Sequence, residues 1–96
     1  MSNEHLIAVS EFCTAHQIEI TFVESLAQHG LITVETVNEQ LSIPDAQLPS
    51  LEKMVRLHYD LEINLEGIET IFHLLERVET LQHEMHELKK RVGFYE

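Results

Sequence analysis

The first 52 residues contain neither lysine nor arginine. The whole chain of 96 residues has 17 Asp and Glu against 6 Lys and Arg, which gives a formal net charge of −11. A surface of this sign repels the phosphates of nucleic acids and anionic lipid heads, and it attracts cationic proteins. We therefore expect a protein as the partner, and neither a nucleic acid nor a membrane.

Cysteine, proline and long apolar runs are also scarce. The lone cysteine, Cys13, cannot form a disulfide within the chain, and the N-terminal stretch lacks the basic and apolar regions of a signal peptide. No apolar run approaches the roughly 20 residues that span a bilayer. These absences predict a cytoplasmic protein. Because Cys13 follows Phe12 on the expected buried side of a helix, with no cation beside it, we expect it to pack in the core.

Patterns of catalytic chemistry are missing as well. The chain has no glycine-rich phosphate loop, and its histidines do not assemble into a Ser-His-Asp set. In the run LQHEMHELKK, His83 and Glu87 lie four residues apart, but the metalloprotease pattern requires a histidine where Glu87 stands. We predict that the chain is not an enzyme and has no catalytic, metal-binding or cofactor-binding residues.

The first 30 residues predict a short strand and two helices. LIAV reads as a strand, Ser10 as the N-cap of the first helix, and Gln17 and Ile18 as a turn. A second helix follows over 20–29, with Gly30 as its stop. Its apolar stripe, which we expect in the core, is Ile20, Val23, Leu26 and Ala27.

A hairpin and a third helix are expected next. The segment 31–43 alternates apolar and polar residues, with Asn38 and Glu39 at the turn. Pro49 fits the first turn of a helix whose buried stripe is Leu51, Met54, Val55, Leu57 and Leu61. The order strand, helix, turn, helix, hairpin, helix predicts a mainly α fold of the winged helix-turn-helix type over residues 1–63.

The last part of the chain, residues 64–96, predicts one long helix and a short tail. Asn64 is the expected N-cap, the helix covers 65–92, and Gly93 ends it. A heptad seam runs through Ile71, Leu74, Val78, Leu81, Met85, Leu88 and Val92. At ~1.5 Å per residue the rod is about 42 Å long, too long to be buried by the small globular part alone. We therefore expect a homodimer, joined through a coiled coil of this helix.

The direction of the predicted coiled coil stays open. A pair between Glu84 and Lys89 of a second chain suits parallel helices, whereas a pair between Arg77 and Glu84 of a second chain suits antiparallel ones. Periodicity alone does not decide between the two arrangements.

The second helix sits where a helix-turn-helix protein reads DNA. Its face opposite the apolar stripe carries Thr21, Glu24, Ser25 and Gln28, with a carboxylate near the centre. Helix-turn-helix modules gain much of their affinity from Lys and Arg that neutralise phosphates. Glu24 would instead repel them, so this face is not expected to bind DNA.

Three segments, LIAVSEFCTAHQI, HGLI and RLHYDLEINLEGIETIFHLLERVETL, resemble the MerR-type winged-helix family. They are most similar to its chaperone-modulator (CbpM-like) branch. The most specific match lies between Arg56 and Leu81. MerR-type DNA binders usually carry Thr-Leu-Arg-Tyr-Tyr on the second helix, and here the same positions hold Phe22, Val23, Glu24, Ser25 and Leu26. The arginine is replaced by Glu24, in agreement with the charge argument.

The resemblance implies a function. Members of that branch bind the J-domain of a DnaJ-like co-chaperone, block its stimulation of Hsp70, and dimerise through the terminal helix. J-domains present a basic helix to an acidic Hsp70 surface, so an acidic protein can compete for it. Two candidate contact faces remain, one with Glu24, Gln28 and Glu35 and the other with Glu52, Asp60 and Glu62. The alternatives are a MerR-like DNA-binding transcriptional regulator and a purely structural dimer.

Overall fold

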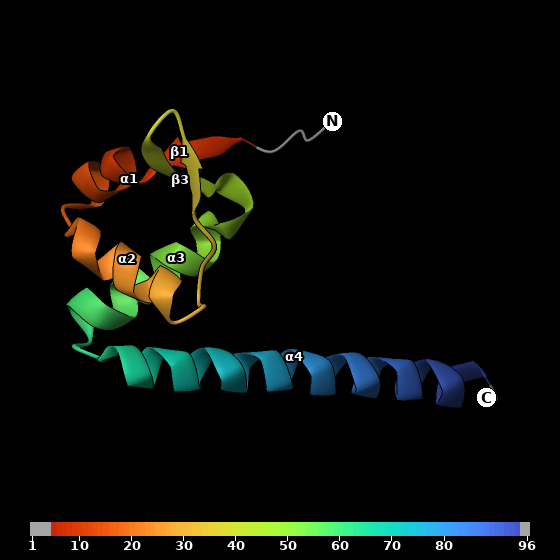
Figure 1. Cartoon of the computed structure of the whole chain (residues 1–96). Coiled ribbons are helices and arrows are strands. Elements are labelled where there is room, and N and C mark those ends of the chain that lie inside the picture. The colour runs from red at the N-terminus through yellow and green to blue at the C-terminus, as the bar shows by residue number, and fades with distance from the viewer. Residues whose placement is uncertain (1–4, 95–96) are drawn as a thin grey trace.

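The computed structural model describes residues 5–94 and is mainly helical, as predicted (Figure 1). A small sheet and a bundle of short helices form the globular part, and one long helix runs past it. In chain order the elements are β1 (Leu6–Ala8), α1 (Val9–His16), α2 (Ile20–Gln28), β2 (Glu35–Val37), β3 (Gln40–Pro44), a 3₁₀ turn (Asp45–Gln47), α3 (Leu48–Val55), the π-helical segment η2 (Arg56–Asp60) and α4 (Leu65–Phe94).

The start of α1 differs from the prediction. The helix begins at Val9, with Ala8 as its N-cap, so Ser10 lies inside the first turn. Val9 is only 2% exposed, and helical geometry at this residue points its side chain into the core. At the other end, Gln17 adopts a left-handed conformation with φ 56°, and its N–H donates to the carbonyl oxygen of Thr14. The predicted turn between the first two helices is confirmed.

Gly30 ends α2 as predicted. It has φ 75°, a conformation that favours glycine, and it follows the C-cap residue His29. Its N–H donates to the carbonyl oxygen of Ala27, and the N–H of Leu31 reaches back to that of Leu26, each at 3.0 Å. These two bonds form a Schellman motif, which satisfies carbonyl groups that the helix end would leave free.

The buried stripe of α2 is not the predicted one. Ile20 is 44% exposed, whereas Phe22 is buried together with Val23 and Leu26. Ile20 and Phe22 are both apolar and lie next to the same stripe. Periodicity alone therefore could not decide which of the two side chains is buried. Phe22 occupies the core position because its ring stacks on the ring of His58, a residue of η2.

The sheet has the order β1-β3-β2, and both pairings are antiparallel. β3 therefore lies in the middle, and Ile43 on it is fully buried. The predicted turn between β2 and β3 is confirmed: Asn38 and Glu39 have φ values of 51° and 64°. Two central residues with positive φ are the signature of the type I′ turn, which suits the right-handed twist of a two-stranded hairpin.

The first arm of the hairpin is shorter than predicted. Only residues 35–37 pair with β3, while 31–34 form no strand. The Gln47 side chain takes the hydrogen bonds instead: its Oε1 accepts from the Thr33 N–H at 2.7 Å, and its Nε2 donates to the Thr33 carbonyl oxygen at 3.3 Å. A side chain from the segment after β3 thus replaces a ladder partner.

The third helix changes character midway. Pro49 lies in the first turn of α3, as predicted, but the helix becomes a π turn over Arg56–Asp60. The Leu61 N–H donates to the carbonyl oxygen of Arg56 five residues earlier, at 3.3 Å. A turn of this kind takes more residues than an α turn, so it breaks the predicted spacing. Leu57 is partly buried and packs against the core, whereas Leu61 is 65% exposed, so the assignment of Leu61 to the core stripe was wrong.

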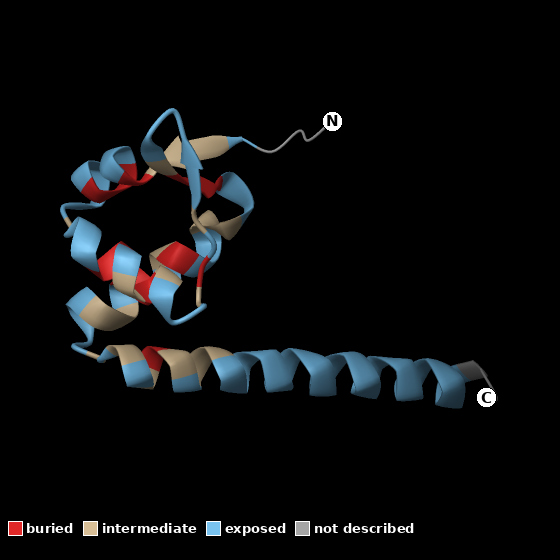
Figure 2. Cartoon of the chain, in the orientation of Figure 1, coloured by how far each residue is buried: buried red, intermediate tan, exposed pale blue. Residues whose placement is uncertain are grey.

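The fourth helix begins as predicted and ends later. The Asn64 Oδ1 accepts the N–H of Gly67 at 2.9 Å, which confirms Asn64 as the N-cap. Gly93 does not stop the helix, since α4 continues to Phe94. Its first turns pack on the globular part, where Ile68 is fully buried, and residues 73–93 are all exposed (Figure 2). Over about two thirds of the rod, every residue is therefore exposed in the single chain.

The core lies between α1, α2, β3, α3 and the start of α4. It consists of twelve buried side chains: Val9, Phe12, Cys13, Phe22, Val23, Leu26, Ile32, Ile43, Leu51, Met54, Val55 and Ile68. Within residues 5–94, no helix is long and apolar enough to cross a membrane. The division of the chain at residue 63 remains a prediction.

Candidate protein-binding surfaces

The first predicted contact face lies on α2 and the hairpin. Glu24 and Gln28 are one turn apart on the exposed side of α2, and Glu35 is the exposed first residue of β2. Neither carboxylate belongs to an ion pair within the described part of the chain. Both remain available to a cationic partner.

The second predicted face is divided. The Glu52 carboxylate lies 3.9 Å from Nε2 of His16 and so ties α3 to α1. Asp60 lies at the end of η2, and Glu62 follows in the loop to α4 with φ 57°. Asp60 and Glu62 are exposed, whereas Glu52 is half-buried and already has a partner when His16 is protonated. Asp60 and Glu62 are therefore the freer part of this face.

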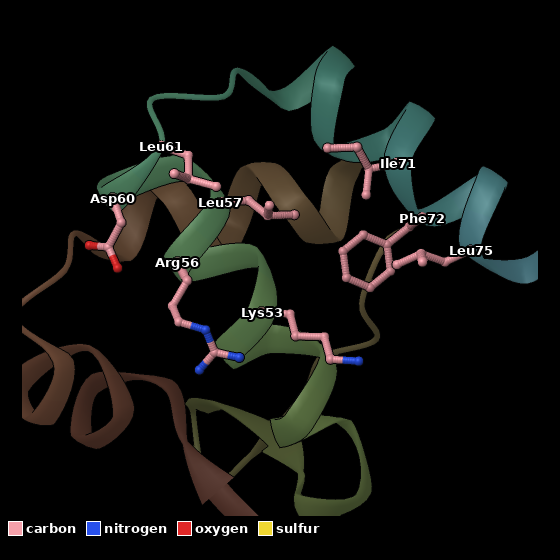
Figure 3. Close-up of a pocket in the computed structure, with 8 residues that line it drawn as sticks. All are labelled: Lys53, Arg56, Leu57, Asp60, Leu61, Ile71, Phe72 and Leu75. Atoms are coloured by element: carbon pink, nitrogen blue, oxygen red, sulfur yellow. The ribbon is translucent and has the colours of Figure 1, made fainter.

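A groove that the sequence does not predict lies beside Asp60. It has a volume of about 360 Å³ and is formed by α3, η2 and the first turns of α4 (Figure 3). Its lining is mostly apolar, with Leu57 and Leu61 on one wall and Ile71, Phe72 and Leu75 on the other, and the remaining lining residues are Lys53, Arg56 and Asp60. The signal in the sequence is Leu61, an apolar residue of the third helix that the structure leaves 65% exposed at the groove.

The two cations of this groove are exceptional in the chain. Lys53 and Arg56 are the only Lys or Arg residues before Arg77. They lie three residues apart across the end of α3, and both are exposed. Among residues 5–94, no carboxylate lies within ion-pair distance of either. The globular part thus places its only Lys and Arg side chains beside this apolar groove.

An aromatic cluster fixes η2, which supplies one wall of the groove. The His58 ring stacks on Phe22 with centroids 4.5 Å apart, and Tyr59 meets both rings edge-on. The His58 Nδ1 lies 2.9 Å from the carbonyl oxygen of Ile63, so a proton on Nδ1 donates to it. The N–H of Glu19 donates to the Tyr59 hydroxyl at 3.2 Å. These contacts hold η2 against α2.

A row of apolar side chains runs uncovered along α4. Of the predicted seam, Ile71 is half-buried at the edge of the groove, and the others are exposed by between 45% and 59%. They are Leu74, Val78, Leu81, Met85, Leu88 and Val92. Contiguous exposed apolar patches of this kind mark sites of protein association.

Cys13 lies in the hydrophobic core. Cys13 is 4% exposed, as the core-packing prediction required, and burial raises the pKa of its thiol. A thiol in this state is a poor nucleophile. In the described residues, no group of three His, Cys, Asp or Glu side chains is placed to hold a metal ion.

Comparison with known proteins adds family membership. Residues 7–90 match the family described as "MerR HTH family regulatory protein". Curated proteins named "Chaperone modulatory protein CbpM", one from Pseudomonas entomophila and two from Pseudomonas putida, are each 29% identical over 82 residues. The alignment covers 84% of this chain and 81% of each relative. No solved structure matches the chain.

The family match covers every element from β1 to most of α4, and it therefore includes both candidate faces and the groove. The chain belongs to the MerR HTH family of regulatory proteins, and its curated relatives there are chaperone modulatory proteins.

Proposed function

We propose that this protein is a chaperone modulator that binds the J-domain of a DnaJ-like co-chaperone in the cytoplasm and inhibits its stimulation of Hsp70. It acts by covering a surface and not as an enzyme. The observation that carries the proposal is the absence of Lys and Arg from the first 52 residues, in a chain similar to chaperone modulatory proteins. The exposed carboxylates of Glu24, Glu35, Asp60 and Glu62 supply the negative surface that a basic helix requires.

The same charges argue against the alternative of DNA reading. In helix-turn-helix regulators the second helix enters the major groove. Here the exposed side of α2 presents Glu24 where an approaching duplex would bring its phosphates. An electrophoretic shift of promoter fragments at moderate salt would favour the regulator, and the proposal expects no shift even at low salt.

The direct test is a calorimetric titration against the J-domain of a DnaJ-like protein from the same organism, repeated at several salt concentrations. We expect saturable binding that weakens as salt increases, because exposed charge pairs are screened. A parallel assay of ATP hydrolysis by Hsp70 should show loss of the stimulation by the co-chaperone. The absence of binding at low salt would refute the proposal.

Two charge-reversal variants then distinguish the faces. One carries Glu24→Lys and Glu35→Lys, and the other carries Asp60→Lys and Glu62→Lys. All four residues are exposed, so both variants should fold, and both change the net charge by the same amount. The face that contacts the J-domain should lose about tenfold or more in affinity, while the other variant measures the effect of bulk charge alone. Equal losses would show that neither face makes the contact.

We also propose that the molecule acts as a dimer through α4. The row of uncovered apolar side chains supports this, since at 45–59% exposure they leave a large apolar surface in water. The proposed dimer would present two copies of each acidic face.

A further inference from the structure

We infer that the groove between η2 and α4 is a docking site for an amphipathic helix of another protein, one with apolar side chains on one face and Glu or Asp at its edge. Asp60 belongs both to the lining of this groove and to one of the two candidate J-domain faces, so the groove borders that face. The ligand of the groove has the opposite charge to a J-domain. The inference does not depend on the proposed function.

Shape is the first argument. At about 360 Å³ the groove is at the small end of the ~300–1,000 Å³ range of ligand pockets. Such pockets usually bury most of a small molecule, but this groove is open on one side, where Leu61 is 65% and Leu75 is 40% exposed. An open trough between two helical segments fits the few apolar side chains that a third helix inserts along one of its faces.

Charge is the second argument. Lys53 and Arg56 line the groove without a carboxylate partner in the described chain, although the chain has many carboxylates to offer. They lie three residues apart at the end of α3, and their side chains spread away from each other at the border of the groove (Figure 3). A ligand helix can therefore meet each of them with a separate carboxylate. The chain as a whole repels acidic ligands, yet at physiological salt the Debye length is only about 8 Å, so the charges of the groove itself matter most. Its lining holds the cations Lys53 and Arg56 against the single carboxylate of Asp60 and is therefore net positive.

The probe for this site is a fluorescein-labelled peptide of about four helical turns, with leucines at i, i+4 and i+7 and glutamates flanking them. A matched peptide replaces each glutamate by lysine. Fluorescence anisotropy of the full chain should show binding of the glutamate peptide and at least about fivefold weaker binding of the lysine peptide.

Two protein variants with the same change in net charge complete the test. Lys53→Glu with Arg56→Glu should weaken the glutamate peptide by about tenfold and strengthen the lysine peptide. Lys90→Glu with Arg91→Glu, at the far end of α4, should leave both peptides within about twofold of their starting affinity, because both side chains are exposed and distant from the groove in the sequence. A Leu61→Asn variant tests the apolar wall, and because this side chain is mostly exposed, it should weaken binding without unfolding the protein.

Several outcomes would overturn the inference. One is an equal loss of peptide affinity in the two double-charge variants, which would show that the peptide responds only to the net charge of the protein. Another is binding of sodium decanoate in place of the peptide, which would make the groove a small-amphiphile site. A change of molecular mass on substitution of Lys53 and Arg56 would mean that a second copy of the chain covers the groove.

Discussion

The His58 ring lies almost parallel to the Phe22 ring, with 4.5 Å between centroids and 15° between planes. This stack joins the first turn of α2 to the π turn η2, two segments far apart in the sequence. It also explains which side chain of α2 enters the core, because Phe22 contributes both apolar area and an aromatic partner. The wall of the groove that carries Leu57 and Leu61 is held in place by this contact.

Replacing Phe22 with alanine should reduce the free energy of unfolding by about 3–5 kcal/mol, the usual cost of removing a buried aromatic ring. Ile20→Ala is the matched control, since Ile20 is 44% exposed and should cost less than about 1 kcal/mol. Urea denaturation followed by circular dichroism measures both. Similar losses for the two variants would contradict the arrangement described for α2.

Leu81→Asp should convert the proposed dimer into monomers, because it places a charge in the middle of the uncovered apolar row. The molecular mass measured by light scattering should then fall from twice the chain mass of 11.2 kDa to that mass itself. His83→Asp, on the same helix but outside the seam, is the control and should keep the larger mass. If Leu81→Asp leaves the mass unchanged, α4 does not dimerise through this row.

Gly67→Ala should destabilise the protein although alanine favours helices. A Cβ at this position would lie 2.6 Å from Cγ2 of Ile63, which is half-buried and has little room to move. We expect a net loss of about 1–2 kcal/mol, since the cost of overpacking exceeds the helical gain of up to about 1 kcal/mol.

Gly93→Ala provides the contrast, because a Cβ there meets nothing within 4 Å. It should be neutral or slightly stabilising in the same thermal unfolding assay. A stabilising Gly67→Ala would show that the approach of Ile63 is easily relieved.

Cys13 should react slowly with a disulfide reagent in the folded protein and rapidly after denaturation. Burial raises the pKa of its thiol above the ordinary value of 9.0, so folding favours the protonated form. Its contribution to stability is therefore complete below pH 9 and is lost as the pH rises from there through the folded-state pKa. Cys13→Ser should reduce this loss of stability at alkaline pH, and an identical profile for the variant would contradict the assignment.

Features with a local cause could be predicted from the sequence. Gly30 and Asn64 act as helix caps through bonds to residues only a few positions away, and the turn at Asn38 and Glu39 follows from their own preference for positive φ. The mainly helical character and the family could be recognised for the same reason, from patterns within short segments.

Features that depend on contact between two distant segments could not be predicted from the sequence. The π turn at η2 has no composition that distinguishes it from an α turn, and it moved Leu61 from the predicted core to the surface. The groove arises only once α4 lies against η2, so no local pattern in the sequence places Lys53 and Arg56 beside it. The acidic contact faces and the seam along α4 have been located in the structure, and their roles remain predictions.

The long exposed stretch of α4 can also report whether another chain is bound along it. Beyond Leu75, the last side chain of α4 that lines the groove, the described residues are exposed. Most helical stability in proteins comes from packing against other segments, which this stretch lacks within a single chain. Amide hydrogen exchange in residues 73–93 should therefore be fast whenever the molecule is alone and slow when another chain lies along it. Protection of these amides at increasing protein concentration, measured residue by residue, would show how much of α4 another chain covers and which end it covers first.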